Sequence, residues 1–126
     1  MTPEALSSLL DYHYWARDRL LEAVERLTPG QFRQDLGNSF DSIRGTLVHL
    51  VSAERAWCLR WRGESPGGHL APTDFETVGE VRARWLKEEA QVREFVEQLG
   101  ADGINLVFRY RQFDGKPRNS VSGLGT

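Results

Sequence analysis

Two histidines lie on the apolar faces of predicted helices, where a metal ligand could sit. His49 lies inside the run 42–57, which has helical periodicity, and His13 lies on the apolar stripe of the first predicted helix. Neutral imidazoles are common ligands of zinc-like metals, and catalytic sites of this kind use three protein ligands. One histidine holds a metal weakly, so His49 has two interpretations: a metal ligand, or a buried imidazole satisfied by one polar neighbour.

His13 is the residue that could add a second ligand. In an antiparallel helix pair it could face His49, so that both imidazoles meet one metal ion. Tyr12, Tyr14 and Trp15 surround it in the sequence, which favours a packed, hydrogen-bonded histidine instead. The two-histidine metal site is therefore one of two hypotheses for His13.

Glu54 is a carboxylate on an apolar helix face. It lies on the line of Leu50 and Trp57, where a charged group is costly unless it has a partner. We expect an ion pair with Arg17 or Arg55; the alternatives are a general base or a group that supports a metal ligand.

Other reactive side chains have simpler interpretations. Cys58 is the single cysteine, so the chain forms no internal disulfide, and we expect a packed thiol. His69 lies in a glycine-rich loop and is expected to be solvated. The sequence has no phosphate-binding loop, nucleophile elbow or His-Glu-x-x-His motif. Enzymatic chemistry would therefore depend on a metal.

Charge and composition exclude several classes of partner. The 126 residues include 16 basic and 18 acidic side chains, spread through the sequence, for a formal net charge of −2. This leaves no basic face for nucleic acid. No apolar stretch approaches the ~18 residues that cross a bilayer, and the N-terminus lacks a signal pattern, so no membrane partner is expected. A chain without disulfides fits a cytoplasmic location.

Three long amphipathic helices are predicted to position these residues. The first begins at Pro3 behind a Thr2 cap and is closed by residues 28–30; the second runs to about Trp61; the third ends near residue 99. Candidate caps of the later helices are Ser39, Asp41 and Ser42, then Thr73 and Thr77. The apolar stripe of the first helix is Leu6, Leu9, Leu10, His13, Ala16, Leu20, Val24 and Leu27.

The predicted fold class is mainly α, an antiparallel up-down helix bundle. Three helices with one apolar stripe each leave a groove poorly covered. A second copy of the chain is the expected occupant, since a symmetric dimer buries the same stripe twice and the 4 tryptophans suit such an interface. We therefore predict a homodimer.

The periodicity changes after Gly100. Apolar residues at 104, 106, 108 and 110 alternate with other residues, and Asp114-Gly115 offers hairpin-turn chemistry, so a short strand or hairpin is predicted over 104–117. Residues 119–126 are polar and glycine-rich, which predicts a disordered tail. The domain is accordingly expected to cover residues 1–118.

Four segments in order carry a family resemblance: residues 14–21, residues 39–50 with the Ser-Ile-Arg-Gly-Thr helix start, residues 53–57 and residues 60–63. With their tryptophans and the single histidine of the second helix, they resemble the DinB family of damage-inducible bacterial proteins, over residues 4–117. The resemblance implies a four-helix bundle, commonly a homodimer, that binds a divalent metal such as nickel or zinc through three histidines.

Only His49 matches a ligand position of that family. The resemblance places the other two ligands in a His-x-x-x-His pattern on a fourth helix after residue 115, where this chain has polar, glycine-rich residues instead. The fourth helix is therefore predicted to be absent. The abrupt change favours a truncated or frame-shifted product over a short form completed by dimerisation. The family-type centre would be incomplete in one protomer unless His13 substitutes.

The resemblance implies a metal-dependent thiol transferase or hydrolase in a stress response, with a small-molecule substrate and a low-molecular-weight thiol as a possible cofactor. The metal would act as a Lewis acid on water or a thiolate. Because the site is incomplete, catalysis by this chain stays an open question. The alternative is a non-catalytic dimeric stress or interaction protein whose groove binds a partner helix or an apolar ligand.

Overall fold

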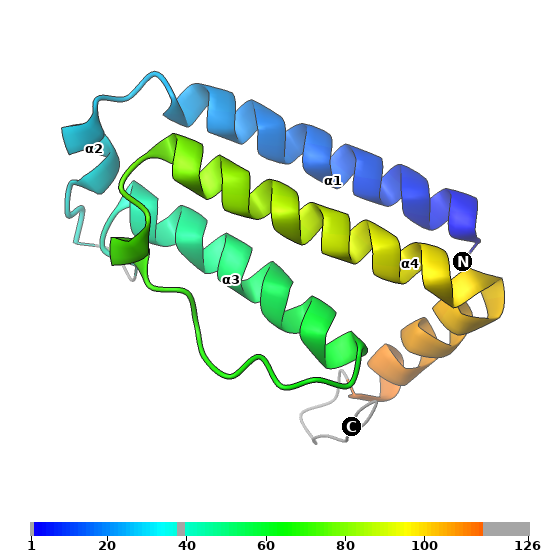
Figure 1. The fold of residues 1–126 in the computed structure, drawn as a ribbon. Helices are drawn as coiled ribbons and strands as arrows, with labels where there is room; N and C mark the ends of the chain where they lie inside the picture. The colour runs from blue at the N-terminus through cyan, green and yellow to red at the C-terminus, as the bar shows by residue number, and fades with distance from the viewer. Residues whose placement is uncertain (1, 38–39, 115–126) are drawn as a thin grey trace.

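Three long helices lie side by side in the computed structural model, with α4 between α1 and α3 (Figure 1). The structure describes the backbone of residues 2–37 and 40–114, and side chains only as far as residue 100. The elements in chain order are α1 (Pro3–Val24), α2 (Pro29–Arg33), α3 (Ile43–Trp61), the 3₁₀ helix η1 (Pro72–Asp74) and α4 (Val78–Asp114). The prediction of a mainly α helix bundle is confirmed.

The helices begin where side-chain caps are available. Thr2 accepts a hydrogen bond from the backbone of Ala5, and Ser42 accepts one from Gly45 at 2.9 Å. Thr77 accepts one from Glu80 at 3.2 Å. Each bond satisfies an N–H group that has no partner inside its helix. Among the candidates named for the two later helices, Ser42 and Thr77 are the caps, while Ser39 lies outside the described residues.

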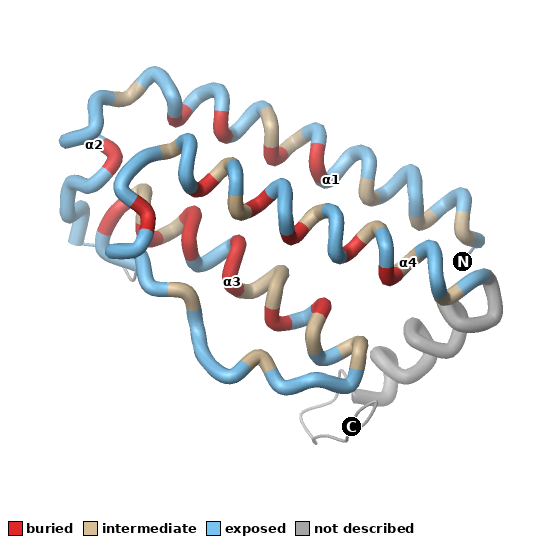
Figure 2. The backbone as a smooth tube through the Cα atoms, in the orientation of Figure 1, coloured by how far each residue is buried: buried red, intermediate tan, exposed pale blue. Residues whose placement is uncertain are grey.

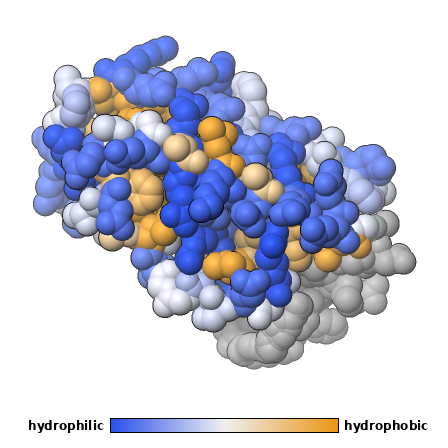
Figure 3. All heavy atoms as spheres, in the orientation of Figure 1, coloured by the Kyte–Doolittle hydropathy of each residue, from blue (hydrophilic) through white to orange (hydrophobic). Residues whose placement is uncertain are grey.

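The core forms where α4 meets the other two long helices. α1 and α3 each pack against α4, whereas their backbones hardly contact each other within the described residues. In Figure 2 the buried positions lie on the sides of the helices that face one another. The main cluster contains Tyr14, Leu21, Val24, Phe32, Leu47, Val48, Val51, Phe75, Val81 and Trp85. The face of the molecule shown in Figure 3 is largely hydrophilic, with smaller apolar patches between polar side chains.

The buried face of α1 differs from the predicted stripe. Its buried residues are Tyr14, Arg17, Leu21 and Val24. Leu9 and Leu20, which the prediction placed in the core, are exposed. Spacings of three and four fit two overlapping lines on this helix, and contact with α4 selects one of them. From the other line, Leu10, His13, Ala16 and Leu20 are left facing the space between α1 and α3.

The short helix α2 occupies residues that the sequence interpretation treated as a turn and a polar loop. Thr28 and Gln31 form a reciprocal capping box, and Pro29 stands at the first helical position. Phe32 is 1% exposed and anchors α2 to the core. The threonine-to-glutamine spacing was the available signal for this helix.

The strand predicted over 104–117 is wrong for residues 104–114, which are helical. Gly100 has φ 69° and ψ −179°, so the chain leaves the helix there and begins a second helical segment of α4. The alternating run also contains residues with helical spacing: Ile104, Val107, Phe108 and Arg111. A run this short is compatible with both a strand and a helix, so its periodicity does not distinguish them. The predicted turn at Gly115, the tail 119–126 and the place of the family's fourth helix lie outside the described residues.

Candidate functional site

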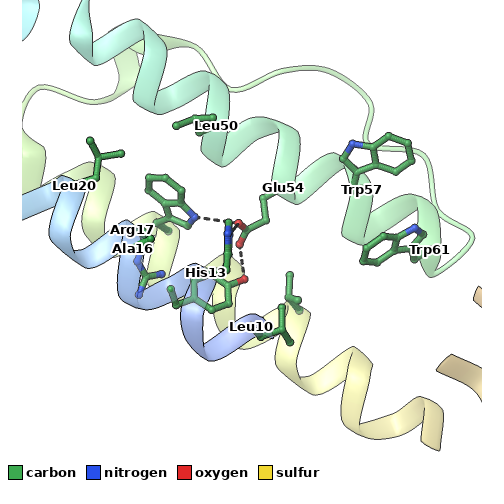
Figure 4. A pocket seen from close by; sticks show the side chains of 12 residues that line it. Leu10, His13, Ala16, Arg17, Leu20, Leu50, Glu54, Trp57 and Trp61 are labelled. Carbon is green, nitrogen blue, oxygen red and sulfur yellow. Dashed lines mark hydrogen bonds and ion pairs between the residues drawn. The ribbon is translucent and has the colours of Figure 1, made fainter. Parts of the chain in front are cut away.

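A groove of about 550 Å³ lies between α1 and α3, with α4 contributing to its lining. Figure 4 shows side chains of α1 and α3 pointing into it from both sides, with Trp57 and Trp61 along α3 beyond Glu54. Most of the lining is aliphatic or aromatic, and it consists of Leu10, His13, Tyr14, Ala16, Arg17, Leu20, Leu50, Glu54, Trp57, Trp61, Trp85 and Val92. The groove between α1 and α3 is therefore the poorly covered groove that the sequence predicts.

The carboxylate of Glu54 joins three helices at the centre of the groove. Nε2 of His13 lies 2.9 Å from Oε1, and the hydroxyl of Tyr14 donates to Oε2 at 2.6 Å. The indole N–H of Trp85 donates to Oε1 at 3.2 Å. An ionised carboxylate only accepts hydrogen bonds, so His13 carries its proton on Nε2 in this arrangement. We call these four residues the Glu54 cluster.

The Glu54 cluster is partly withdrawn from water. The side chain of Glu54 is 15% exposed, whereas that of His13 is 51% exposed at the edge of the groove. Burial raises the pKa of Tyr14 strongly, and the hydrogen bond to Glu54 and its negative charge raise this pKa further. Tyr14 therefore stays a neutral donor to the carboxylate.

The expected ion pair of Glu54 with an arginine is wrong, although the need for partners is confirmed. Arg17 instead pairs with Glu89 at 2.7 Å and with Asp18 at 3.0 Å. Arg55 donates to the backbone carbonyls of residues 66 and 68. The carboxylate is held by His13 and Tyr14 of α1 and by Trp85 of α4, a solution that the search for an arginine partner in the sequence did not find.

His49 lies in different surroundings. Its side chain is on an exposed position of α3 and stacks on the ring of Phe40, with ring centroids 4.2 Å apart. It lines a second cavity of about 210 Å³ together with His69. His69, predicted to be solvated, is exposed, and its Nδ1 lies 3.5 Å from the hydroxyl of Ser52. The buried-imidazole interpretation of His49 does not describe this position.

His13 and His49 line separate cavities, and the structure does not bring them together as two ligands of one metal. Within residues 2–37 and 40–100, no three His, Cys, Asp or Glu side chains are grouped so that they could hold a metal ion. Three protein ligands are the usual requirement of a catalytic zinc-type site. The donor set of the described chain therefore does not fit the metal centre that the family resemblance implies.

Cys58 is a packed thiol, as predicted. It is 3% exposed and belongs to a small cluster with Val92 and Phe95. Burial raises the pKa of the thiol, although Arg62 acts in the opposite direction. A thiol whose pKa is raised is a poor nucleophile, so Cys58 contributes to packing.

Three hydrogen-bond partners fix the Glu54 carboxylate within the described part of the chain. Sequence reasoning singled out Glu54 and His13 but missed Tyr14 and Trp85 as their partners. The only signal was the position of two aromatic donors on apolar stripes, where a buried N–H or O–H needs an acceptor.

Comparison with known proteins assigns the fold to a family. None of the helices in the described part of the chain is long and apolar enough to cross a membrane. Searches of curated proteins and of solved structures gave no match. The DinB family model matches residues 1–101, most of the chain. The chain therefore belongs to the DinB family.

Proposed function

We propose that this DinB-family protein binds a small, largely apolar ligand in the groove between α1 and α3. The observation that carries the proposal is an apolar groove of about 550 Å³ built by three helices around one fixed polar cluster. Small-molecule sites have this size and this combination of apolar walls with few oriented polar groups.

The exposed apolar residues support this proposal. Leu20, Leu50 and Trp57 are 40%, 40% and 43% exposed, and all three line the groove. Their apolar surface faces water when the groove is empty, so a ligand that covers them removes this surface from water. The gain is about 25 cal/mol for each Å² covered.

Metal-dependent thiol chemistry has less support in this chain. The family resemblance implies His49 alone as a ligand, and the described donors do not complete a three-ligand site. The proposed ligand binding therefore requires neither a metal nor a thiol cofactor. Homodimer formation stays a prediction, and a second copy on this face would compete with the ligand.

The proposal is tested with the uncharged fluorescent probe N-phenyl-1-naphthylamine, whose emission rises in apolar surroundings. Ala16→Trp places a large ring in the groove, since Ala16 lines it. Ala23→Trp is the matched control, because Ala23 is exposed on α1 and does not line the groove. Circular dichroism of both variants establishes that the helices are intact.

We expect saturable binding of the probe to the unmodified chain and to Ala23→Trp. Ala16→Trp should weaken it by about tenfold or more, since the ring occupies the volume that the ligand needs. Equal binding by both variants, or no saturable binding to the unmodified chain, would contradict the proposal.

A further inference from the structure

We propose that the groove selects amphiphiles with a protonated primary amine, whose ammonium group binds Glu54 while the apolar chain lies between α1 and α3. This inference rests on the proposed function and adds the ligand's chemical class. It comes from the one acceptor position that the Glu54 cluster leaves open, and from the charges around it.

The hydrogen bonds at Glu54 leave room for one more donor. Oε1 accepts from His13 and Trp85, which uses both of its lone-pair directions. Oε2 accepts from Tyr14 alone within the described residues. A ligand N–H group can therefore donate a further hydrogen bond to Oε2. A ligand group that can only accept hydrogen bonds finds no donor at this oxygen.

The charges lining the groove favour a cation. Glu54 brings a negative charge to the groove, and its described partners there are the side chains of His13, Tyr14 and Trp85. The other charged residue of the lining, Arg17, has a side chain that is 3% exposed and paired with two carboxylates. Its positive charge is thus already matched by carboxylates, whereas no lysine or arginine pairs with Glu54 in the described residues, so the partly exposed Glu54 sets the sign of the ligand.

Aromatic side chains extend this preference along the groove. Trp57 and Trp61 lie on α3 beyond Glu54, as Figure 4 shows. Tryptophan faces attract cations, and Trp57 already has the guanidinium of Arg60 at 5.4 Å from its ring centroid. The same rings provide apolar contact for the methylene groups of an alkyl chain.

The competing head groups make different demands. A carboxylate would lie against Glu54 with repulsion of like charges, and an alcohol would donate to Oε2 without the gain of opposite charge. An ammonium group supplies both the donor and the charge. Alkyl chains of equal length therefore separate the contribution of the head group from that of apolar contact.

The experiment measures displacement of N-phenyl-1-naphthylamine by octylammonium, octanol and octanoate, each below its micelle-forming concentration. We expect octylammonium to bind about tenfold more tightly than octanol, because a charge-assisted hydrogen bond is about twice as strong as a neutral one. Octanoate should be the weakest of the three. This comparison uses the unmodified chain and does not depend on any variant.

Two variants then locate the selectivity. Glu54→Gln should reduce the preference for octylammonium over octanol to about threefold or less, while octanol still binds. Glu64→Gln is the matched control, since Glu64 is exposed, makes the same change of charge and does not line the groove. It should keep the preference.

The outcomes separate this inference from the function on which it rests. If the probe binds but octylammonium has no advantage over octanol, or octanoate binds best, the amine inference is wrong and apolar binding stands. A preference that persists in Glu54→Gln also overturns it. If neither the probe nor any of the three ligands binds, the proposed function fails with it.

Discussion

Glu54 and His49 lie five residues apart on α3, yet the helix gives them opposite surroundings. Glu54 is mostly covered and holds donors from α1 and α4, whereas His49 is exposed and stacks on Phe40. Position around the helix, rather than residue type, decides which polar side chain becomes part of the folded scaffold. The carboxylate that sequence alone marks as costly is the better-satisfied group.

The largest difference between the two positions should appear in stability. Glu54→Ala leaves the hydroxyl of Tyr14 and the indole N–H of Trp85 without their acceptor, so we expect the free energy of unfolding to fall by about 3 kcal/mol. His49→Ala removes an exposed ring contact and should change the free energy of unfolding by less than about 0.5 kcal/mol. Urea denaturation followed by circular dichroism measures both; equal losses would contradict the comparison.

A second change disturbs the His49 region through the backbone. A Cβ at Gly45 would collide with the backbone carbonyl of Phe40, so Gly45→Ala should lower the free energy of unfolding by about 2 kcal/mol. Gly79→Ala is the control, because its Cβ meets only an ordinary contact in α4 and alanine favours helix. Equal free energies of unfolding for Gly45→Ala and Gly79→Ala would contradict the close approach of the Phe40 backbone to Gly45.

The Glu54 cluster should also give a signature at high pH. Below about pH 10 Tyr14 keeps its proton in both states; above it the unfolded chain releases this proton while the folded chain retains it. The free energy of unfolding should therefore fall with rising pH, by at most about 1.4 kcal/mol per pH unit from this group. Tyr14→Phe should show a shallower slope in denaturation curves; an unchanged slope would show that Tyr14 ionises normally.

The smallest effect is expected from added metal. The described donors do not complete a three-ligand site, so nickel or zinc should raise the melting temperature only slightly. The rise should be the same for the unmodified chain and for His49→Ala. Elemental analysis after gel filtration gives the stoichiometry. One tightly bound metal per chain, lost in His49→Ala, would contradict this expectation and restore the metal-centre hypothesis.

The sequence predicted the parts of the fold that local chemistry determines. The cap at Thr2 and the buried stripe of α4 through Val81, Trp85 and Val92 follow from spacing alone, whereas spacing left Ser42 and Thr77 among several candidate caps of the later helices. The helical state of residues 101–114 did not, because their apolar residues satisfy a period of two and a helical period at once.

Two residues of the Glu54 cluster, His13 and Glu54, were predictable from the sequence, but their contacts were not. His13 and Glu54 stood out because a polar group on an apolar stripe needs a partner. The contact between His13 and Glu54 joins residues 41 positions apart in the sequence. It depends on the rotation of α1 about its own axis where α1 packs against α4. The predicted stripe of α1 placed His13 in the core; the actual turn of the helix places it at the groove.

The most direct test of the groove's role is a ¹⁵N–¹H spectrum of the indole N–H groups during a titration with octylammonium. Trp57, Trp61 and Trp85 line the groove, whereas Trp15 does not and serves as an internal control. We predict that the first three signals move together and saturate, while the signal of Trp15 stays unchanged. A shift confined to Trp15, or no saturable shift at all, would contradict the account.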